Sequence, residues 1–264
     1  MSGLFSSGIA TAVQPDLVGG SEATGNTSWM ASVQYDAPDY GRVAWHTCGG
    51  ALLFRSWVVT NAHCVSDMPD NPGGIPTSAK TFSVRVGSKD RTQGGETAKV
   101  TKIVVHPGWQ WSAGAPEQTV DDIALLKLDH EVDKQPIQLA GRPARTSERV
   151  MLYGWGADQP DGNPSNLPRK LQQLSTRVLP PARCSDAQQS AGEICTNNPH
   201  GTDGPGSGDS GGPAVEVIDG VAKLVGTCSR AAARYPGEAP TVYTSSPEFR
   251  GWLYDTARGA PAGA

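Results

Sequence analysis

The residues best suited to chemistry lie in a glycine-rich run, GDSGGP, at positions 208–213. Glycines beside a serine allow backbone N–H groups to converge on a small concavity next to the hydroxyl. Such a concavity can hold the oxyanion of a tetrahedral intermediate, at about 3–4 kcal/mol for each donor. A bare serine between glycines is often an ordinary turn, whereas the full six-residue run is far more specific. It indicates that Ser210 is a nucleophile.

A serine hydroxyl needs a base within hydrogen-bond reach to react at neutral pH. His63 lies in the stretch TNAHC, directly after the apolar run 57–59, so a strand delivers it to a loop. The remaining histidines lack this setting, and we expect them to be structural or solvated: His46, His106, His130 and His200.

The base in turn needs a carboxylate that orients its ring and stabilises the imidazolium. Asp122 directly precedes the apolar run 123–126, and an acid that enters a buried strand is costly unless it is paired. Asp121 is the alternative, although its position suits a solvated turn residue. This motif is weak when taken alone.

The rest of the chain is typical of an all-β protein. Its 264 residues include 32 Gly and 21 Pro, which favour many short strands over long helices. Residues 129–148 are polar, and they separate six short apolar or alternating runs from six more. These runs lie at 31–35, 51–54, 57–60, 82–86, 99–106, 123–128, 149–155, 170–179, 193–196, 213–218, 223–229 and 241–245.

Two closed or nearly closed six-stranded units would remove exposed strand edges. We therefore predict an all-β fold with two six-stranded antiparallel β-barrels packed together. Phe249, Trp252 and Leu253 follow helical spacing after Pro247, which predicts a short C-terminal α-helix. The expected bounds are about 28–130 for the N-terminal barrel, 131–148 for a linker, 149–245 for the C-terminal barrel, 247–258 for the helix and 259–264 for a tail.

Charge and cysteine usage narrow the environment. The formal net charge is −4 without a Lys/Arg cluster, so nucleic acid is not expected as a partner. No apolar run reaches the roughly 18–20 residues that span a bilayer, so no membrane is expected either. Five cysteines permit two disulfides and one leftover thiol, which implies an oxidising compartment, or else five reduced thiols. The first ten residues do not look like a signal peptide, so secretion has to be inferred from other features.

The three motifs, in the order His, Asp, Ser, resemble the trypsin/chymotrypsin family, as a secreted member of the bacterial type. The resemblance runs from Leu17 to about Ala257. It implies the two-barrel fold and a serine endopeptidase that acts on protein or peptide substrates. Further matching segments are LVGG (17–20), Trp29, CGGAL (48–52), GWG (154–156) and VYT (242–244).

The resemblance also assigns roles. It makes Ser210 the nucleophile, His63 the general base and then acid, and Asp122 its orienting partner. The N–H groups of Gly208 and Ser210 would form the oxyanion hole, and Ser229 would support Asp122. An ordinary strand residue is the alternative for Ser229.

The cysteines follow the family in part. The positions of a third family disulfide, beside the specificity pocket, hold Gly206 and Arg234. Cys228 would then be a buried thiol that packs as a small hydrophobe. The disulfides implied by the resemblance are Cys48–Cys64 and Cys184–Cys195.

The specificity pocket departs from that of trypsin-like members, which carry Asp at the floor where this chain has Gly204. Thr241 replaces a wall glycine and narrows the slot. Arg230 brings positive charge beside the substrate chain, with Ala231 next to it. We expect small or medium apolar side chains at P1, unless the loop shifts enough for Asp203 to reach the pocket.

The resemblance implies a zymogen activated by cleavage directly before Leu17, with residues 1–16 as a propeptide. The new amine would pair with buried Asp209, which before cleavage would pair with His46 and Ser32. The alternative is that 1–16 is only an unstructured leader.

Neither a cofactor nor a metal is expected, because Ser88 stands where the family's calcium loop begins with a glutamate. We expect a monomer, with a protein protease inhibitor as a further partner. The competing interpretations are a catalytically silent homologue that acts as a binding module, and a non-proteolytic hydrolase. An α/β-hydrolase would need G-x-S-x-G around the serine, which Ser210 lacks.

Overall fold

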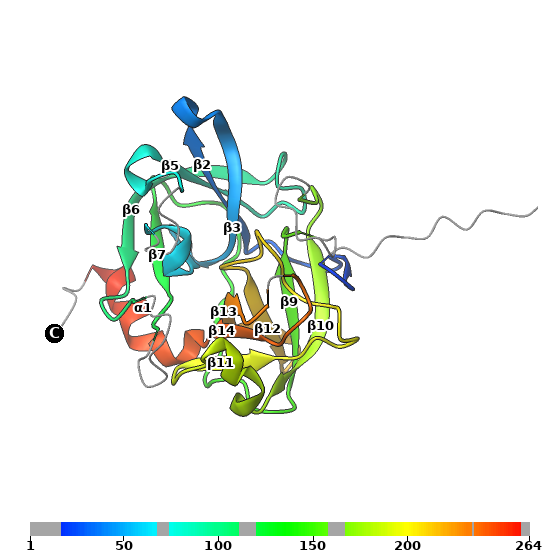
Figure 1. Ribbon diagram of the computed structural model, residues 1–264. Coiled ribbons are helices and arrows are strands. Elements are labelled where there is room, and N and C mark those ends of the chain that lie inside the picture. The colour runs from blue at the N-terminus through cyan, green and yellow to red at the C-terminus, as the bar shows by residue number, and fades with distance from the viewer. Residues whose placement is uncertain (1–16, 68–73, 111–119, 158–166, 234, 260–264) are drawn as a thin grey trace, which may run out of the picture.

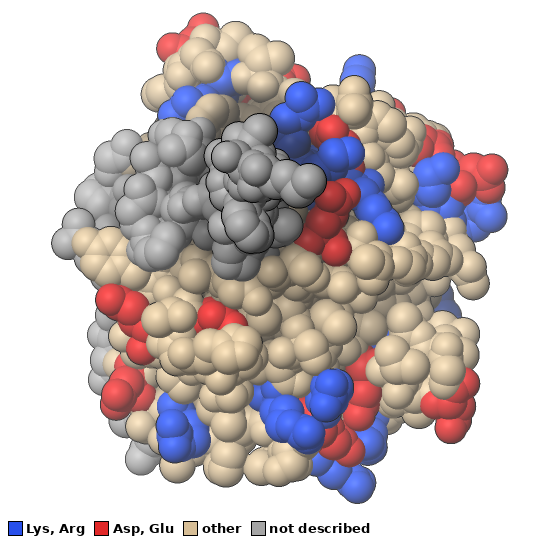
Figure 2. Space-filling view, turned by 90° about the vertical axis from the view of Figure 1, so that its right-hand side faces the viewer, with Lys and Arg blue, Asp and Glu red and all other residues tan. Residues whose placement is uncertain are grey.

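The computed structural model describes residues 17–67, 74–110, 120–157, 167–233 and 235–259 (Figure 1). Two antiparallel β-barrels lie against each other, and a short helix follows the second. The predicted all-β fold with two six-stranded barrels and a C-terminal helix is confirmed. On the face shown in Figure 2, basic and acidic side chains are intermixed and form no continuous basic surface.

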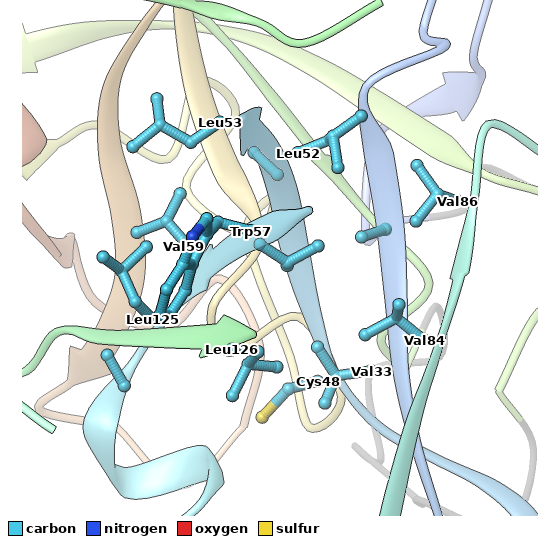
Figure 3. Packing of buried hydrophobic residues seen from close by; sticks show 14 of the residues in the cluster. Val33, Cys48, Leu52, Leu53, Trp57, Val59, Val84, Val86, Leu125 and Leu126 are labelled. Carbon is cyan, nitrogen blue, oxygen red and sulfur yellow. The ribbon is translucent and has the colours of Figure 1, made fainter. Parts of the chain in front are cut away.

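The N-terminal barrel closes in the order β2-β3-β4-β7-β6-β5. In β5, buried Phe82, Val84 and Val86 alternate with more exposed residues, so one face of the strand fills the barrel. Figure 3 shows side chains from several strands meeting in this interior. The strands are β2 (Met30–Ala37), β3 (Arg42–Phe54), β4 (Trp57–Thr60), β5 (Thr81–Val86), β6 (Glu96–Val105) and β7 (Ala124–Leu128).

The C-terminal barrel runs β10-β11-β14-β13-β12-β9, and pairing of β9 with β10 closes it. Two short strands add to it, since β1 pairs with β10 and β8 lies parallel to β13. The strands are β1 (Ser21–Glu22), β8 (Gln138–Leu139), β9 (Arg149–Gly154), β10 (Gln172–Leu179), β11 (Glu193–Thr196), β12 (Pro213–Ile218), β13 (Val221–Ala231) and β14 (Thr241–Thr244).

The two barrels meet closely at a pair of glycines. A Cβ on Gly49 would lie 2.7 Å from the Cα of Gly212, so neither barrel could approach this way with a larger residue at position 49. Beside this contact, Trp29 packs edge-to-face on Tyr153, with ring centroids 5.3 Å apart. This contact sets the distance between the segments that carry the candidate site.

The structure adds detail at three of the boundaries expected from the sequence. The strand expected at 51–54 begins at Arg42, because its first residues pair with β2 in a long hairpin although apolar and polar residues do not alternate regularly there. The linker 131–148 contains β8. The helix expected at 247–258 starts as a 3-10 turn, Ser246–Phe249, and α1 spans Arg250–Arg258.

The other helical segments are short 3-10 turns. They are Pro38–Tyr40, Ala62–Cys64, Thr77–Ala79 and Pro181–Ala187. The expected propeptide 1–16, Arg234 and the last residues of the expected tail lie outside the described residues.

Candidate active site

Two neighbouring strands bring His63 and Asp122 together. Strand β4 ends at Thr60, three residues before His63, and β7 begins at Ala124, two residues after Asp122. The two strands pair with Thr60 opposite Ala124, so both side chains leave the barrel at the same end. The Cys48–Cys64 disulfide ties the His63 turn to β3. The position of each residue follows from the strand that precedes or follows it.

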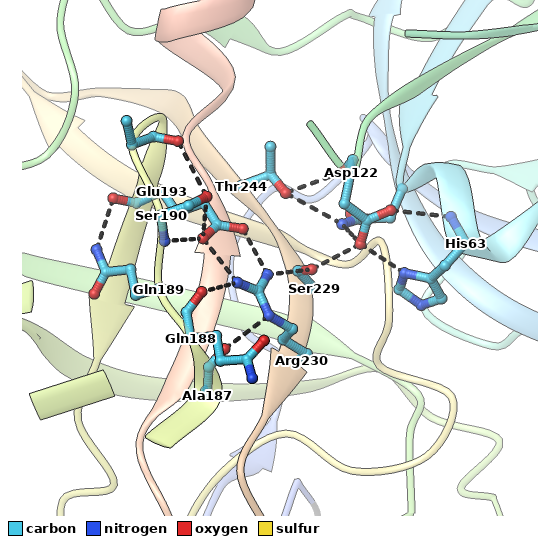
Figure 4. Close-up of polar contacts among 12 residues, drawn as sticks. His63, Asp122, Ala187, Gln188, Gln189, Ser190, Glu193, Ser229, Arg230 and Thr244 are labelled. Carbon is cyan, nitrogen blue, oxygen red and sulfur yellow. Dashed lines mark hydrogen bonds and ion pairs between the residues drawn. The ribbon is translucent and has the colours of Figure 1, made fainter. Parts of the chain in front are cut away.

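Asp122 is fully buried and holds His63 by two hydrogen bonds (Figure 4). The His63 amide donates to Oδ1 at 2.9 Å, and Nδ1 donates to Oδ2 at 2.7 Å. An ionised carboxylate only accepts hydrogen bonds, so the Nδ1 of His63 carries the hydrogen and Nε2 is the acceptor in the neutral ring. Asp122 therefore selects the tautomer that a general base requires.

Further donors satisfy the same carboxylate. Ser229 Oγ donates to Oδ2 of Asp122 at 2.7 Å, and Asn61 Nδ2 donates to it at 2.8 Å. Burial by itself raises the pKa of Asp122, but the charge of His63 and the hydrogen bonds from His63 and Ser229 outweigh it and hold that pKa below its usual value. The buried acid is thus stabilised as an anion.

Asn61 and Thr244 were not identified from the sequence. Thr244 Oγ1 donates to the backbone carbonyl of Asp122 at 3.0 Å, so the two residues fix both ends of the acid. The sequence signal for them was their place in two matching segments, since Asn61 lies in TNAHC and Thr244 in VYT.

The Ser210 turn lies against the N-terminal barrel. The Gly49 amide donates to the Ser210 carbonyl at 2.7 Å. Gly211 has φ +73°, and a Cβ there would stand 2.1 Å from Oγ1 of Thr60 and 2.5 Å from the Gly49 carbonyl oxygen. Only glycine fits, and the nucleophile turn therefore reaches the strand that carries His63.

The amides on either side of Asp209 are available to a ligand. Within the described part of the chain, neither the Gly208 amide nor the Ser210 amide donates to a protein acceptor. Ser210 Oγ likewise makes no hydrogen bond to a described residue, His63 included. Catalytic hydrogen bonds are often long before substrate binds, so this arrangement is compatible with a reactive serine.

Asp209 is buried, and the amides of Gly156 and Gly206 donate to its two oxygens at 2.7 and 2.8 Å. The pairing with His46 and Ser32 that the resemblance implied is not formed. Instead, His46 Nδ1 accepts from Ser32 Oγ at 2.8 Å, and its Nε2 donates to the Gly208 carbonyl at 3.1 Å.

Leu17 lies inside the C-terminal barrel. The residue is 1% exposed and belongs to a buried cluster that includes Val150 and Leu152. The next residue, Val18, accepts a hydrogen bond from the Gly204 amide at 3.0 Å. The segment that follows the expected cleavage point is therefore docked against the loop that leads to Ser210.

A cavity of about 180 Å³ opens beside Ser210. Thr241, Arg230 and Ala231 line it, as expected, but Gly204 is not among its lining residues. Asp203 does not reach the cavity either, because its carboxylate contacts His200 and packs against Gly19. The lining residues are Pro205, Gly206, Ser207, Ser210, Cys228, Ser229, Arg230, Ala231, Ala233, Tyr235, Pro236 and Thr241.

The family described as Trypsin matches residues 17–253. The chain belongs to the trypsin family. It is accordingly a chymotrypsin-like serine endopeptidase, and the family acts on protein or peptide substrates. The bacterial type expected from the sequence stays a prediction.

Several animal proteins of this family are similar over nearly their whole length. Chymotrypsin-like elastase family member 1 of Rattus norvegicus is 33% identical, over 90% of this chain and 88% of its own. Fibrinolytic enzyme isozyme C of Lumbricus rubellus is 30% identical, over 92% of this chain and all of its own. The mouse serine protease neuropsin shares the fold, with a TM-score of 0.71 and 23% identity over 91% of this chain and 99% of its own.

Arg230 of this trypsin-family enzyme lies beside the cavity with its charge paired. Its guanidinium forms an ion pair with Glu193, with Nη1 close to Oε1 and Nη2 at 2.9 Å from Oε2. The positive charge beside the substrate site is therefore neutralised by a buried acid.

The cysteines near the site differ in their bonding. The described residues contain one group of three potential ligands, Cys48, His63 and Cys64, but its two sulfurs are joined in a disulfide. A second disulfide joins Cys184 to Cys195. Cys228 is a buried thiol whose pKa is raised by burial, so it packs as a neutral group beside the cavity.

Proposed function

We propose that this chain hydrolyses internal peptide bonds through an acyl-enzyme on Ser210. Ser210 Oγ attacks the carbonyl carbon while His63 Nε2 takes its proton. As the C–N bond breaks, His63 gives that proton to the departing amine. Water then attacks the ester with His63 again as base, and the proton returns to Ser210 as the acid product leaves. Asp122 stays ionised throughout and stabilises the imidazolium.

The observation that carries this proposal is the double hydrogen bond between Asp122 and His63. It sets the ring orientation and the tautomer together, and the anion is already stabilised before any proton moves. The amides of Gly208 and Ser210 are the oxyanion donors, because both lack a described protein acceptor.

The central experiment is covalent labelling of Ser210 with an organophosphonate, followed by turnover of a peptide. We expect one label per chain at Ser210, and none in Ser210→Ala. A folded protein that neither labels nor cleaves would be a catalytically silent homologue. Labelling with ester turnover but without peptide turnover would indicate a non-proteolytic hydrolase.

The substrate side chain at P1 is small or medium and apolar. No carboxylate is among the residues that line the described cavity, and Ala231, Ala233 and Cys228 supply small apolar side chains beside its hydroxyl groups. Gly204 does not line the cavity, and its amide instead donates a hydrogen bond to the Val18 carbonyl. A relative named as an elastase is consistent with this preference.

A P1-scanning peptide library tests the preference. Peptides with Ala, Val or Leu should be cleaved faster than those with Arg or Lys. A clear Arg or Lys preference that disappears in Asp203→Ala would mean that Asp203 turns into the pocket when substrate binds.

Cleavage before Leu17 activates the enzyme, and its new amine pairs with Asp209. The burial of Leu17 and the docking of Val18 on Gly204 support this, because the segment already lies on the loop before Ser210. An amine there would place a positive charge beside a buried carboxylate and so offset part of the cost of burying that anion.

The test compares the full chain with a chain that begins at Leu17, and with the latter after acetylation of its amine. Peptidase activity should be confined to the free-amine form. Equal activity in all three would rule out activation by cleavage before Leu17, while leaving the Ser210 chemistry intact.

The enzyme works outside the cell and is a monomer. A protein protease inhibitor is a further partner there. Two disulfides suit an oxidising compartment. None of the helices in the described residues has the length and apolar character that crossing a membrane would require. Sedimentation and non-reducing mass spectrometry of the exported protein test the oligomeric state and the disulfides.

A further inference from the structure

Arg230 is held by Glu193 at the start of β11 and by two backbone carbonyls at the end of the preceding 3-10 turn. Besides its ion pair with Glu193, its Nε donates to the Ala187 carbonyl at 2.9 Å and its Nη2 to the Gln188 carbonyl at 2.7 Å. The side chain of Glu193 is 2% exposed and that of Arg230 13%. The guanidinium is therefore fixed in direction by groups on three sides.

Glu193 is itself anchored. The Ser190 amide and hydroxyl donate to its Oε2 at 2.7 and 3.0 Å, and the residue begins a strand whose Cys195 is in a disulfide. A planar guanidinium gripped by such a carboxylate has little freedom to rotate.

The remaining contact of this guanidinium leads to the catalytic acid. Arg230 Nη1 lies 3.3 Å from Ser229 Oγ, and Ser229 Oγ lies 2.7 Å from Oδ2 of Asp122 (Figure 4). A guanidinium only donates hydrogen bonds, so the Ser229 oxygen must accept from it. The single hydroxyl hydrogen of Ser229 is then directed to Asp122.

We propose that Arg230 is a positioning residue for the reaction, anchored by Glu193 and acting through the Ser229 hydroxyl on Asp122. Without it, the Ser229 hydroxyl could rotate toward other acceptors, and Asp122 would lose a donor for part of the time. The proposal rests on the proposed function, in which Asp122 stabilises the His63 imidazolium.

The alternative is that the ion pair only fastens the loop around residue 188 to β13. Such a structural role would change stability or substrate binding. A role through Ser229 would lower kcat and would depend on the Ser229 hydroxyl. The two are separated by a double-mutant cycle.

The first arm combines Arg230→Met with Glu193→Gln, so that no unpaired charge is left buried. We expect kcat to fall about fivefold, the factor for one hydrogen bond of about 1 kcal/mol, with KM unchanged. In a Ser229→Ala background the same pair should change kcat less than twofold.

A second arm guards against misfolding. Arg230→Lys retains a charge for Glu193 but removes the planar fork that serves Glu193 and Ser229 together. It should lower kcat to a similar extent. The matched control is Arg142→Gln with Glu148→Gln, which breaks another two-bonded Arg–Glu pair in the segment that precedes β9. This control should leave kcat unchanged.

The NMR resonance of the His63 Nδ1 hydrogen gives a readout that needs no turnover. It should move in Arg230→Lys but not in the Arg142/Glu148 control. Equal losses of kcat with and without the Ser229 hydroxyl, or no loss, would overturn the proposal while the wild type stays active. An inactive wild type would instead count against the proposed function, and an unmoved resonance would then still count against the role of Arg230.

Discussion

Each barrel contributes a serine-centred chain of hydrogen bonds to the site, and the two chains differ in charge. In the N-terminal barrel, Gln34 Nε2 donates to Ser32 Oγ at 2.9 Å, and Ser32 donates to His46 Nδ1. His46 Nε2 then donates to the carbonyl of Gly208. Every member of this chain is neutral.

In the C-terminal barrel the corresponding serine lies between charges. Arg230 donates to Ser229, which donates to the Asp122 anion. Both serines have their hydroxyl direction set by a donor-only group behind them. The neutral chain orients a backbone carbonyl, whereas the charged chain stabilises the acid that the chemistry needs.

The two histidines show the consequence of this difference. The pKa of His46 is lowered to about 4, because burial and, to a smaller extent, nearby Arg91 outweigh the opposing hydrogen bond to Gly208. The ring at position 46 thus stays neutral, while the ring of His63 faces an anion that can support its protonated form. The same ring type has two roles because its neighbours differ.

Breaking the charged chain at its acid should have the largest effect. Asp122→Asn favours the wrong tautomer of His63, so kcat should fall by roughly 10⁴ while the fold is retained. Steady-state kinetics and a thermal melt measure the two quantities. A loss below tenfold would mean that Asp122 does not set the tautomer.

A change at Gly208, whose carbonyl ends the neutral chain of hydrogen bonds, should have the next largest effect on kcat. Gly208 has φ +97°, and a Cβ there would lie 3.1 Å from Leu167. Gly208→Ala should therefore displace the amide that donates to the oxyanion and lower kcat by about 10²–10³. Titration of Ser210 with a phosphonate shows whether the serine is still reactive. Unchanged kcat would exclude this amide as an oxyanion donor.

Acid should affect the neutral chain through His46. Between pH 6.5 and 4 the unfolded chain binds a proton at this position and the folded chain does not, so the free energy of unfolding rises with pH across this window. Acidification should thus cost about 3 kcal/mol from this group. Urea unfolding at pH 6.5 and 4 measures the loss, and His46→Asn should reduce it. An identical loss in the variant would assign the effect to other groups.

Ser32→Ala should have the smallest effect. It removes the donor to His46 Nδ1 without touching the oxyanion amides, so kcat should fall about fivefold, as for one hydrogen bond. The pH dependence of kcat should be unchanged, because Ser32 does not contact Asp122, whereas Ser229 donates to that acid. A loss as large as that of Asp122→Asn would show that the neutral chain has a direct part in catalysis.

Much of this protein was accessible from its sequence. The alternation of apolar residues and turns predicted two six-stranded barrels, because each strand must bury one face whatever its partners are. The residues that form the site were predicted from GDSGGP, TNAHC and the acid before 123–126, since each lies next to an apolar strand that fixes its position. Asn61 and Thr244 were within reach for the same reason.

Other features depended on the tertiary structure. The first half of β3 carries no strand pattern of its own and forms because β2 lies beside it. Asp203 turns to His200 and Gly19, although the sequence allowed it to reach the pocket, and Arg230 beside the cavity pairs with Glu193. Glu193 is 37 residues from Arg230, and Gly19 comes from the other end of the chain from Asp203, so only the folded chain brings these partners together. The sequence by itself determined which groups are present, and the packing of the two barrels decided which of them meet.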